Sequence, residues 1–171
     1  MKSIKQDLVD FVQSTPVRCS GDINFQHFVL ANGTEHIRHP DPQRFFTRHG
    51  ATGQCFKNAF LLVSEFRNEL LYAEGYVRTS NSPMLILHAW ALKAKGEYID
   101  PTLPDGIDYF GVPFDFEYVT GIVFRDEEFT GVILNHRNNC PLLSGKATNW
   151  RPKVMLITNP PSPPPLPPSL S

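Results

Sequence analysis

The chain has 171 residues, enough for one domain with a hydrophobic core, and its 41% hydrophobic and 19% charged residues are typical of a globular protein. A formal net charge of −1 gives no general attraction to nucleic acid or to anionic membranes. No apolar run approaches the ~18–20 residues that cross a bilayer, and the first residues lack the apolar core of a signal peptide, so we expect a cytoplasmic protein with no nucleic-acid or membrane partner.

The cysteine and histidine patterns indicate neither disulfides nor a metal site. Cys19, Cys55 and Cys140 are an odd set without the paired spacing of a disulfide framework or zinc ribbon. His36 and His39 lie close together, but in a stretch that resembles a proline-bounded loop and without the i, i+4 pair of a helical metal site. We therefore expect free thiols, exposed loop histidines and no metal or other cofactor.

The first third of the chain contains one clear helix. Apolar residues at positions 4, 8, 11 and 12 share one face of a helix that Pro16 would end. Residues 23–30 are apolar without a clear period, so helix and strand both remain possible. Asn32 and Gly33 indicate a turn, and the prolines that follow predict an irregular connection through Gln43.

Cys55 stands at the start of the next predicted helix. Apolar residues recur there at three- and four-residue steps, at positions 56, 59, 60, 63, 66 and 70. Gly53 suits a tight turn into this helix, and we expect Thr52 to cap it. Free N–H groups and the helix dipole stabilise a thiolate at this position, so Cys55 is a candidate nucleophile. The alternative is a small, buried packing residue.

Three strands are predicted after this helix, at residues 70–77, 84–92 and 97–100, with a turn near Ser80–Pro83. Alternation places His88 and Trp90 on the same face of the second strand. A short hairpin loop centred on Ala94 would bring Asp100 directly opposite His88. The sequence therefore predicts an adjacent histidine–aspartate pair.

The last third is less regular. Residues 109–114 are aromatic and suit either a cleft wall or the core, whereas residues 117–124 are predicted to form a strand. Residues 126–150 give no clear assignment, and residues 153–157 suit an edge strand. Seven prolines within residues 160–168 predict an extended tail, with either an SH3- or WW-like partner or simple disorder.

Cys55, His88 and Asp100 together suggest acyl-transfer chemistry. Such chemistry needs a thiolate, a histidine that moves protons, and a partner that fixes the orientation of the imidazole. The backbone N–H of Cys55 is one candidate oxyanion donor, and the weaker candidates for oxyanion or substrate binding are Gln54, Gln43 and Trp90.

Three short motifs carry a resemblance to a known family. They are residues 53–56 (GQCF), 88–90 (HAW) and 98–102 (YIDPT), and they resemble the core motifs of the transglutaminase-like superfamily, circularly permuted relatives of the papain-like cysteine proteases. The resemblance covers residues 50–120. It implies an α+β fold in which the cysteine helix packs against an antiparallel sheet that carries the histidine and the aspartate. We expect one such domain at residues 1–158, followed by a proline-rich tail at 159–171.

The resemblance also implies roles for the three residues and a class of substrate. Cys55 would be the nucleophile, His88 the general acid and base, and Asp100 its orienting partner, acting on an amide or peptide bond through a thioester. Members include proteases, transglutaminases and peptide N-glycanases, and the motifs do not select among them. We expect a protein or peptide substrate, and hydrolysis rather than transamidation because water is always at hand. The alternative is an inactive domain that serves as a protein-binding module.

Two departures from related patterns are visible. No tryptophan precedes Cys55 to match the oxyanion donor of animal transglutaminases. The arylamine N-acetyltransferases share the Cys–His–Asp order, but their usual Arg-Gly-Gly before the cysteine is absent here. The second oxyanion donor is thus not fixed by the resemblance.

Overall fold

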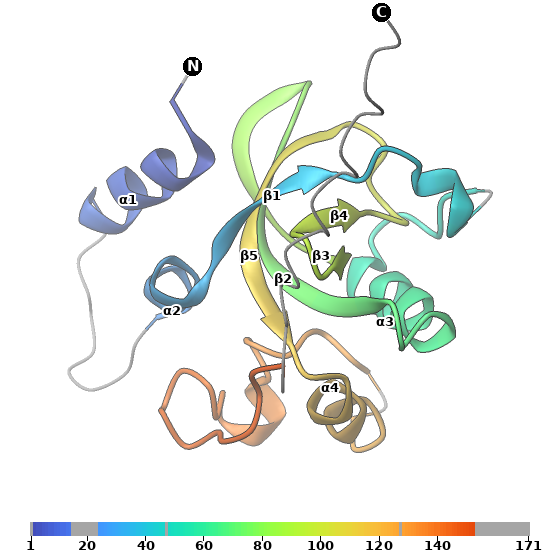
Figure 1. Ribbon diagram of the computed structural model, residues 1–171. Helices are drawn as coiled ribbons and strands as arrows, with labels where there is room; N and C mark the ends of the chain where they lie inside the picture. Colours follow the sequence, from blue (N-terminus) through green and yellow to red (C-terminus); the bar gives the residue numbers. More distant parts are fainter. Residues whose placement is uncertain (1, 15–23, 47, 127, 153–171) are drawn as a thin grey trace, which may run out of the picture.

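The computed structural model describes residues 2–14, 24–46, 48–126 and 128–152 and shows a mixed α and β fold (Figure 1). The helices of this part are α1 (Ile4–Ser14), α2 (Phe25–Asn32), α3 (Cys55–Glu65) and α4 (Phe116–Val123), with short 3-10 turns at Pro42–Arg44 and His136–Asn138. The strands are β1 (Thr34–Arg38), β2 (Leu70–Thr79), β3 (Ser82–Lys93), β4 (Glu97–Ile99) and β5 (Gly106–Phe114). The predicted α+β class is confirmed.

The five strands form one closed sheet in the order β1-β4-β3-β2-β5. Strand β2 pairs antiparallel with both β3 and β5, and these long pairings form the body of the sheet. Strand β1 closes it, antiparallel to β5 and parallel to β4. The predicted antiparallel sheet is therefore present, with one short parallel pair at its closure.

Alternation along the strands divides the core into two clusters. Trp90, Tyr98 and Tyr109 belong to a small cluster on one face of the sheet, the inner face of the barrel. The ring of Trp90 lies within 2.5 Å of the place that a Cβ on Gly111 would occupy, so only glycine fits beneath it. The opposite face of the same strands joins residues of all four helices in a larger cluster. The strands next to Cys55 are thus fixed on both faces.

Most of the predicted elements are confirmed. These are the helix at 4–14, the helix beginning at Cys55, and strands close to 70–77, 84–92 and 97–100. The ambiguous residues 23–30 contain most of α2, which begins after Asn24, whose side chain accepts a hydrogen bond from the backbone N–H of His27. The aromatic residues of 109–114 belong to β5 and fill the core.

The predicted strand at 117–124 is wrong, because these residues form helix α4. The carboxylate of Asp115 accepts hydrogen bonds from the backbone N–H groups of Glu117 and Tyr118, which starts the helix. Val119 and Ile122, three residues apart, are its buried face. Their β-branched side chains favoured a strand, but the cap and the packing of that face decide the structure.

The predicted loop after Gly33 is also wrong, because residues 34–38 form strand β1. His36 and His39 are buried, at 6% and 8% exposure, and not exposed loop histidines. Among the described residues, no group of three or more histidine, cysteine, aspartate or glutamate side chains is arranged to hold a metal ion.

Three predictions fall outside the described residues: the state of Cys19, the edge strand at 153–157 and the proline-rich tail at 159–171. In the part of the chain that is described, no helix combines the length and the apolar character needed to cross a bilayer.

Candidate active site

Cys55 is the first residue of α3, as its sequence position predicts. Gly53 has φ +78°, a left-handed conformation that glycine adopts without strain, and it turns the chain into the helix. Thr52 does not cap the helix: the cap position is Gln54, whose side chain makes no capping hydrogen bond. The N–H groups of the first turn are therefore not occupied by a capping side chain, which favours an anion next to Cys55.

His88 and Asp100 form a buried pair in which the imidazole Nε2 lies 2.7 Å from the carboxylate Oδ2. The register differs from the predicted one by a single loop position. Ala91 pairs with Ile99, so the same register places Asp100 opposite Trp90 and diagonal to His88. Both side chains still meet, because diagonal positions share one face of a sheet.

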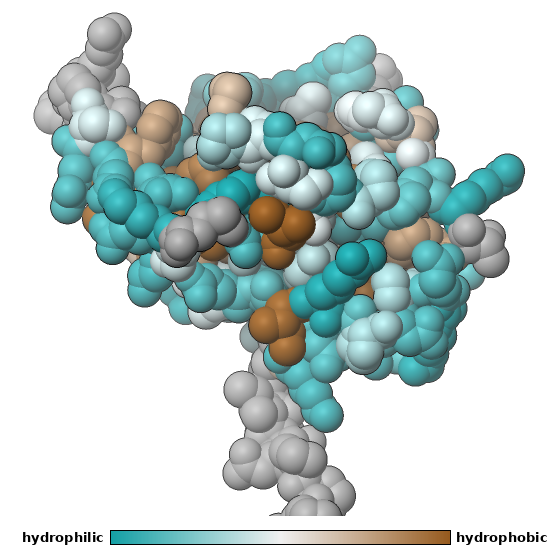
Figure 2. Space-filling model, turned by 90° about the horizontal axis from the view of Figure 1, so that it is seen from above, coloured by the Kyte–Doolittle hydropathy of each residue, from teal (hydrophilic) through white to brown (hydrophobic). Residues whose placement is uncertain are grey.

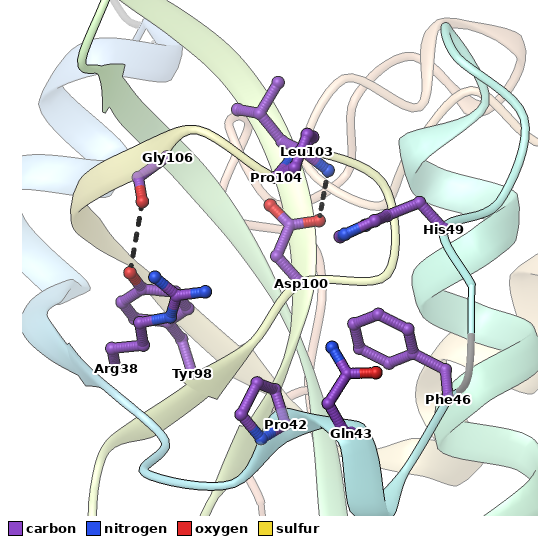
Figure 3. Close-up of a pocket in the computed structure, with 10 residues that line it drawn as sticks. All are labelled: Arg38, Pro42, Gln43, Phe46, His49, Tyr98, Asp100, Leu103, Pro104 and Gly106. Carbon is purple, nitrogen blue, oxygen red and sulfur yellow. Dashed lines mark hydrogen bonds between the residues drawn. The ribbon is translucent and has the colours of Figure 1, made fainter.

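Asp100 is held by four donors, including His88. Its Oδ1 accepts hydrogen bonds from the backbone N–H groups of Thr102 and Leu103, at 2.8 and 3.0 Å. Its Oδ2 accepts a third from the hydroxyl of Tyr109 at 2.6 Å, in addition to the bond from His88. The bond from Leu103 is visible in Figure 3. These donors satisfy the buried carboxylate and fix its orientation.

The surroundings of His88 favour its protonated form. Burial is the largest effect and opposes the charge, but hydrogen bonds with Asp100 and Cys55, and the negative charges of both, outweigh it and raise the pKa of His88 to about 9. Since Nε2 faces Asp100, the other ring nitrogen, Nδ1, is the one left for the thiol. The imidazole therefore joins the cysteine to the aspartate.

The chain segments that carry Cys55 and Asp100 are also joined by the backbone and by one side chain. The amide of Asn58, one turn after Cys55, donates to the carbonyl of Ala51 at 2.9 Å and to the hydroxyl of Thr102 at 3.1 Å. The backbone N–H of Gly50 donates to the carbonyl of Pro101 at 2.6 Å. The start of α3 is thereby tied to the loop that follows Asp100.

Trp90 supports His88 from within the barrel. Its indole lies nearly parallel to the imidazole, with ring centroids 6.4 Å apart, and is fully buried. Its N–H donates to Nδ1 of His36 at 3.1 Å, and burial lowers the pKa of His36 to about 4, which keeps that ring neutral and able to accept. Trp90 is thus fully buried behind His88 in this structure, and its predicted part in oxyanion or substrate binding stays a prediction.

The two glutamines considered for the oxyanion lie next to different residues of the site. Gln54 is exposed beside Cys55 at the start of α3. Gln43 lies with His49 and Phe46 in a small pocket against Asp100, into which His49 and Gln43 point (Figure 3). Gln54 is therefore the better placed of the two for an oxyanion formed at Cys55.

A further buried polar group near the cysteine, Glu74, was not among the predicted site residues. Glu74 is 1% exposed and accepts hydrogen bonds from the hydroxyl of Tyr72 at 2.6 Å and from the backbone N–H groups of Val132 and Ile133 at 2.6 and 3.0 Å. Burial raises the pKa of Glu74 to about 7 in spite of these three donors. A glutamate within a strand of core residues is the only signal that pointed to this group.

The structure thus brings together Cys55, His88 and Asp100, with Gln54 beside the cysteine, while their catalytic roles stay predictions. Comparison of the chain with protein-family models, curated proteins and solved structures found no match. Any assignment of function therefore depends on the geometry of these residues.

Proposed function

We propose that the protein is a cysteine-dependent acyl-transfer enzyme of the transglutaminase-like type, in which Cys55, His88 and Asp100 act on an amide or peptide bond. The observation that carries this proposal is the buried 2.7 Å pair of His88 and Asp100 next to a cysteine at a helix N-terminus. A cysteine helix packed against a sheet that bears the other two residues supports the same assignment.

The first half of the reaction makes a thioester. With a pKa of about 9, His88 holds a proton at neutral pH, and its hydrogen bond with Cys55 places that proton next to the sulfur that acts, as a thiolate, as the nucleophile. The thiolate attacks the acyl carbon, and the carbonyl π electrons move to oxygen, where the N–H of Cys55 and the side chain of Gln54 are the candidate donors. The oxyanion then collapses, the C–N bond breaks, and the leaving amine takes the proton of His88.

The second half regenerates the enzyme. His88, now neutral, accepts a proton from water as the water oxygen attacks the thioester carbon. Collapse of this second oxyanion breaks the C–S bond, releasing the carboxylic acid and the thiolate beside a protonated His88. Asp100 holds the imidazole in one orientation through both halves and keeps its own negative charge. Water as the acceptor makes hydrolysis, as a protease or deamidase, the favoured outcome over transamidation.

The test measures acyl-enzyme formation with N-acetyl-L-alanine p-nitrophenyl ester, an activated acyl donor that demands little of the substrate site. Mass spectrometry locates the acyl group, and the melting temperature of each variant shows whether it folds. We expect acylation of Cys55 in the native protein, none in Cys55→Ala, and a loss of roughly 10³-fold or more in His88→Ala. Asp100→Ala should lose less of the acylation rate, because Asp100 only orients the imidazole.

Two outcomes would contradict the proposal. A folded His88→Ala variant that acylates at the native rate would mean that His88 is not the base. Alkylation of Cys55 by iodoacetamide no faster than that of Cys140 would mean that the thiol is not activated, and would favour the protein-binding alternative. A product that contains an added amine, in place of free acid, would assign transamidation.

A further inference from the structure

A cavity of about 750 Å³ lies beside the N-terminal turns of α3, within the ~300–1,000 Å³ range of small-molecule sites. One wall comes from the start of α3 and the residues before it. The other comes from the end of α4 and the segment after it. The lining includes Gln54, Phe56, Phe60, Asp126, Phe129 and Thr130.

The interior of this cavity is aromatic. The ring of Phe129 meets those of Phe56 and Phe60 edge to face, with centroids 6.4 and 6.1 Å apart. The acidic residues of the lining are already balanced, because the guanidinium of Arg137 lies 2.9 Å from Asp126 and 3.3 Å from Glu128. The apolar part of the lining is formed by these three rings together with Leu61 and Val123, and burial of apolar surface there favours an apolar occupant.

The cavity is directly next to the nucleophile. Gln54 and Phe56, the residues before and after Cys55, both line it, and consecutive Cα atoms are about 3.8 Å apart. Cys55 does not line it, because its thiol faces His88. A cavity lined by both chain neighbours of Cys55 is thus available to the side chain of an acyl donor bound at the thiol.

The far wall is fixed to the barrel. Phe129 also contacts Tyr72, with ring centroids 6.0 Å apart, and the chain just after it is held by the two backbone N–H groups that donate to Glu74. Gly131 has φ +119°, and a Cβ there would lie 2.9 Å from the ring of Phe56. This close fit leaves the wall little freedom, and a rigid wall lowers the entropic cost of binding.

The other cavity and the exposed surface are less suited to bind an apolar side chain. The cavity on the opposite flank of α3 measures about 490 Å³ and is lined by several charged side chains, among them Arg44, Arg48 and Glu65. On the face seen in Figure 2, hydrophobic residues lie in small separate patches among hydrophilic ones, as is normal for a protein surface.

We propose that the cavity beside α3 is the substrate-specificity site of the enzyme and that it receives a large apolar side chain, aromatic in shape, on the acyl donor that Cys55 attacks. This inference rests on the proposed function and narrows it to acyl donors with such a side chain. It makes Phe56, Phe60 and Phe129 specificity residues, with no part in the movement of protons.

The test compares acylation of Cys55 by the p-nitrophenyl esters of N-acetyl-L-phenylalanine and N-acetyl-L-alanine, in which the C–S bond forms as p-nitrophenolate leaves. The native protein should favour the phenylalanine ester roughly 10- to 100-fold. Thr130→Trp fills the cavity from an exposed position, so the preference should fall to near one through loss on the phenylalanine ester. The matched control is Glu65→Trp, a tryptophan on α3 facing the other cavity, which should keep the native preference.

Equal rates for the two esters in the native protein would overturn the inference, as would a full preference in folded Thr130→Trp. A second measurement stands apart from the chemistry: the binding of N-acetyl-L-phenylalaninamide and N-acetyl-L-alaninamide to Cys55→Ala, followed by NMR shifts at the Gln54 and Lys57 amides. The aromatic amide should bind at least tenfold more tightly, and equal binding would refute the site. Failure of both esters to acylate Cys55, with aromatic binding retained, would refute the proposed function and leave the site standing.

Discussion

Two donors share one carboxylate oxygen of Asp100, and this sharing limits how far Asp100 raises the pKa of His88. The hydroxyl of Tyr109 and the imidazole of His88 both bond to Oδ2, at 2.6 and 2.7 Å. A hydrogen bond from a neutral hydroxyl draws negative charge away from the ion pair. Tyr109, which the sequence analysis did not place in the site, therefore moderates the basicity of the imidazole.

Removing this hydroxyl should raise the pKa of His88. In Tyr109→Phe the carboxylate keeps its charge but loses one donor, so its attraction for the imidazolium grows and the pKa should rise from about 9 by roughly 0.5 unit. NMR titration of the imidazole measures this shift. Tyr98→Phe is the control, because the Tyr98 ring stacks on Tyr109 but its hydroxyl donates to the carbonyl of Gly106 (Figure 3). A lower midpoint in Tyr109→Phe would contradict this account of the shared oxygen.

The sequence predicted that Cys55, His88 and Asp100 lie close together, but not the groups that hold them in place. Alternation and hairpin geometry suffice to place His88 and Asp100 on one face. The loop centre lies one residue later than predicted, which shifts the pairing by two residues, and a two-residue shift keeps both side chains on the same face. The hydroxyl of Tyr109 and the amide of Asn58 reach the site only through the tertiary structure. Local sequence patterns do not predict contacts between residues that are distant in sequence.

At the scale of elements, Asn58 is the link between helix α3 and the loop after Asp100. Asn58→Ala removes two hydrogen bonds that join these segments, at 2.9 and 3.1 Å, and should lower the free energy of unfolding by ~1–3 kcal/mol. Alkylation of Cys55 by iodoacetamide should slow several-fold, because the thiol loses its fixed position against His88. Chemical unfolding and labelling rates test both effects, with Glu65→Ala on the exposed side of α3 as the control. Native labelling in a destabilised Asn58→Ala would limit this residue to a structural role.

Helix α4 shows how a cap outweighs strand propensity. Asp115→Ala removes the side chain that accepts from the first backbone N–H groups of the helix and should lower the free energy of unfolding by ~1 kcal/mol. Asp115→Asn keeps an accepting oxygen, so its free energy of unfolding should fall much less. Urea unfolding of both variants makes the comparison, and equal losses would show that charge at the helix N-terminus, rather than the hydrogen bonds, carries the effect.

The whole molecule depends on chain segments that have no regular structure. Residues 126–150 showed no periodicity, yet Val132 and Ile133 are fully buried in the main core. Trp150 contacts Phe28 and Phe114, and its carbonyl accepts a hydrogen bond from the backbone of Asp115. These segments are positioned by contacts distant in sequence, which is why sequence periodicity could not assign them.

Glu74 of β2 accepts hydrogen bonds from the backbone of Val132 and Ile133, so its titration should be visible in the stability of the whole molecule. Its pKa is raised from 4.5 to about 7, so the folded state binds the proton more tightly than the unfolded state does. The stabilisation is complete below pH 4.5 and is lost as the pH rises through 7, a decrease of order 3 kcal/mol in the free energy of unfolding.

Glu74→Gln does not titrate, so the difference between native and variant free energies should change across this window. Urea unfolding at pH 4.5, 5.5 and 7 measures that difference, in which the other titrating groups cancel. Glu65→Gln, the same exchange at an exposed site, should run parallel to the native protein. A difference between native protein and Glu74→Gln that stays constant from pH 4.5 to 7 would mean that the pKa of Glu74 does not change on folding.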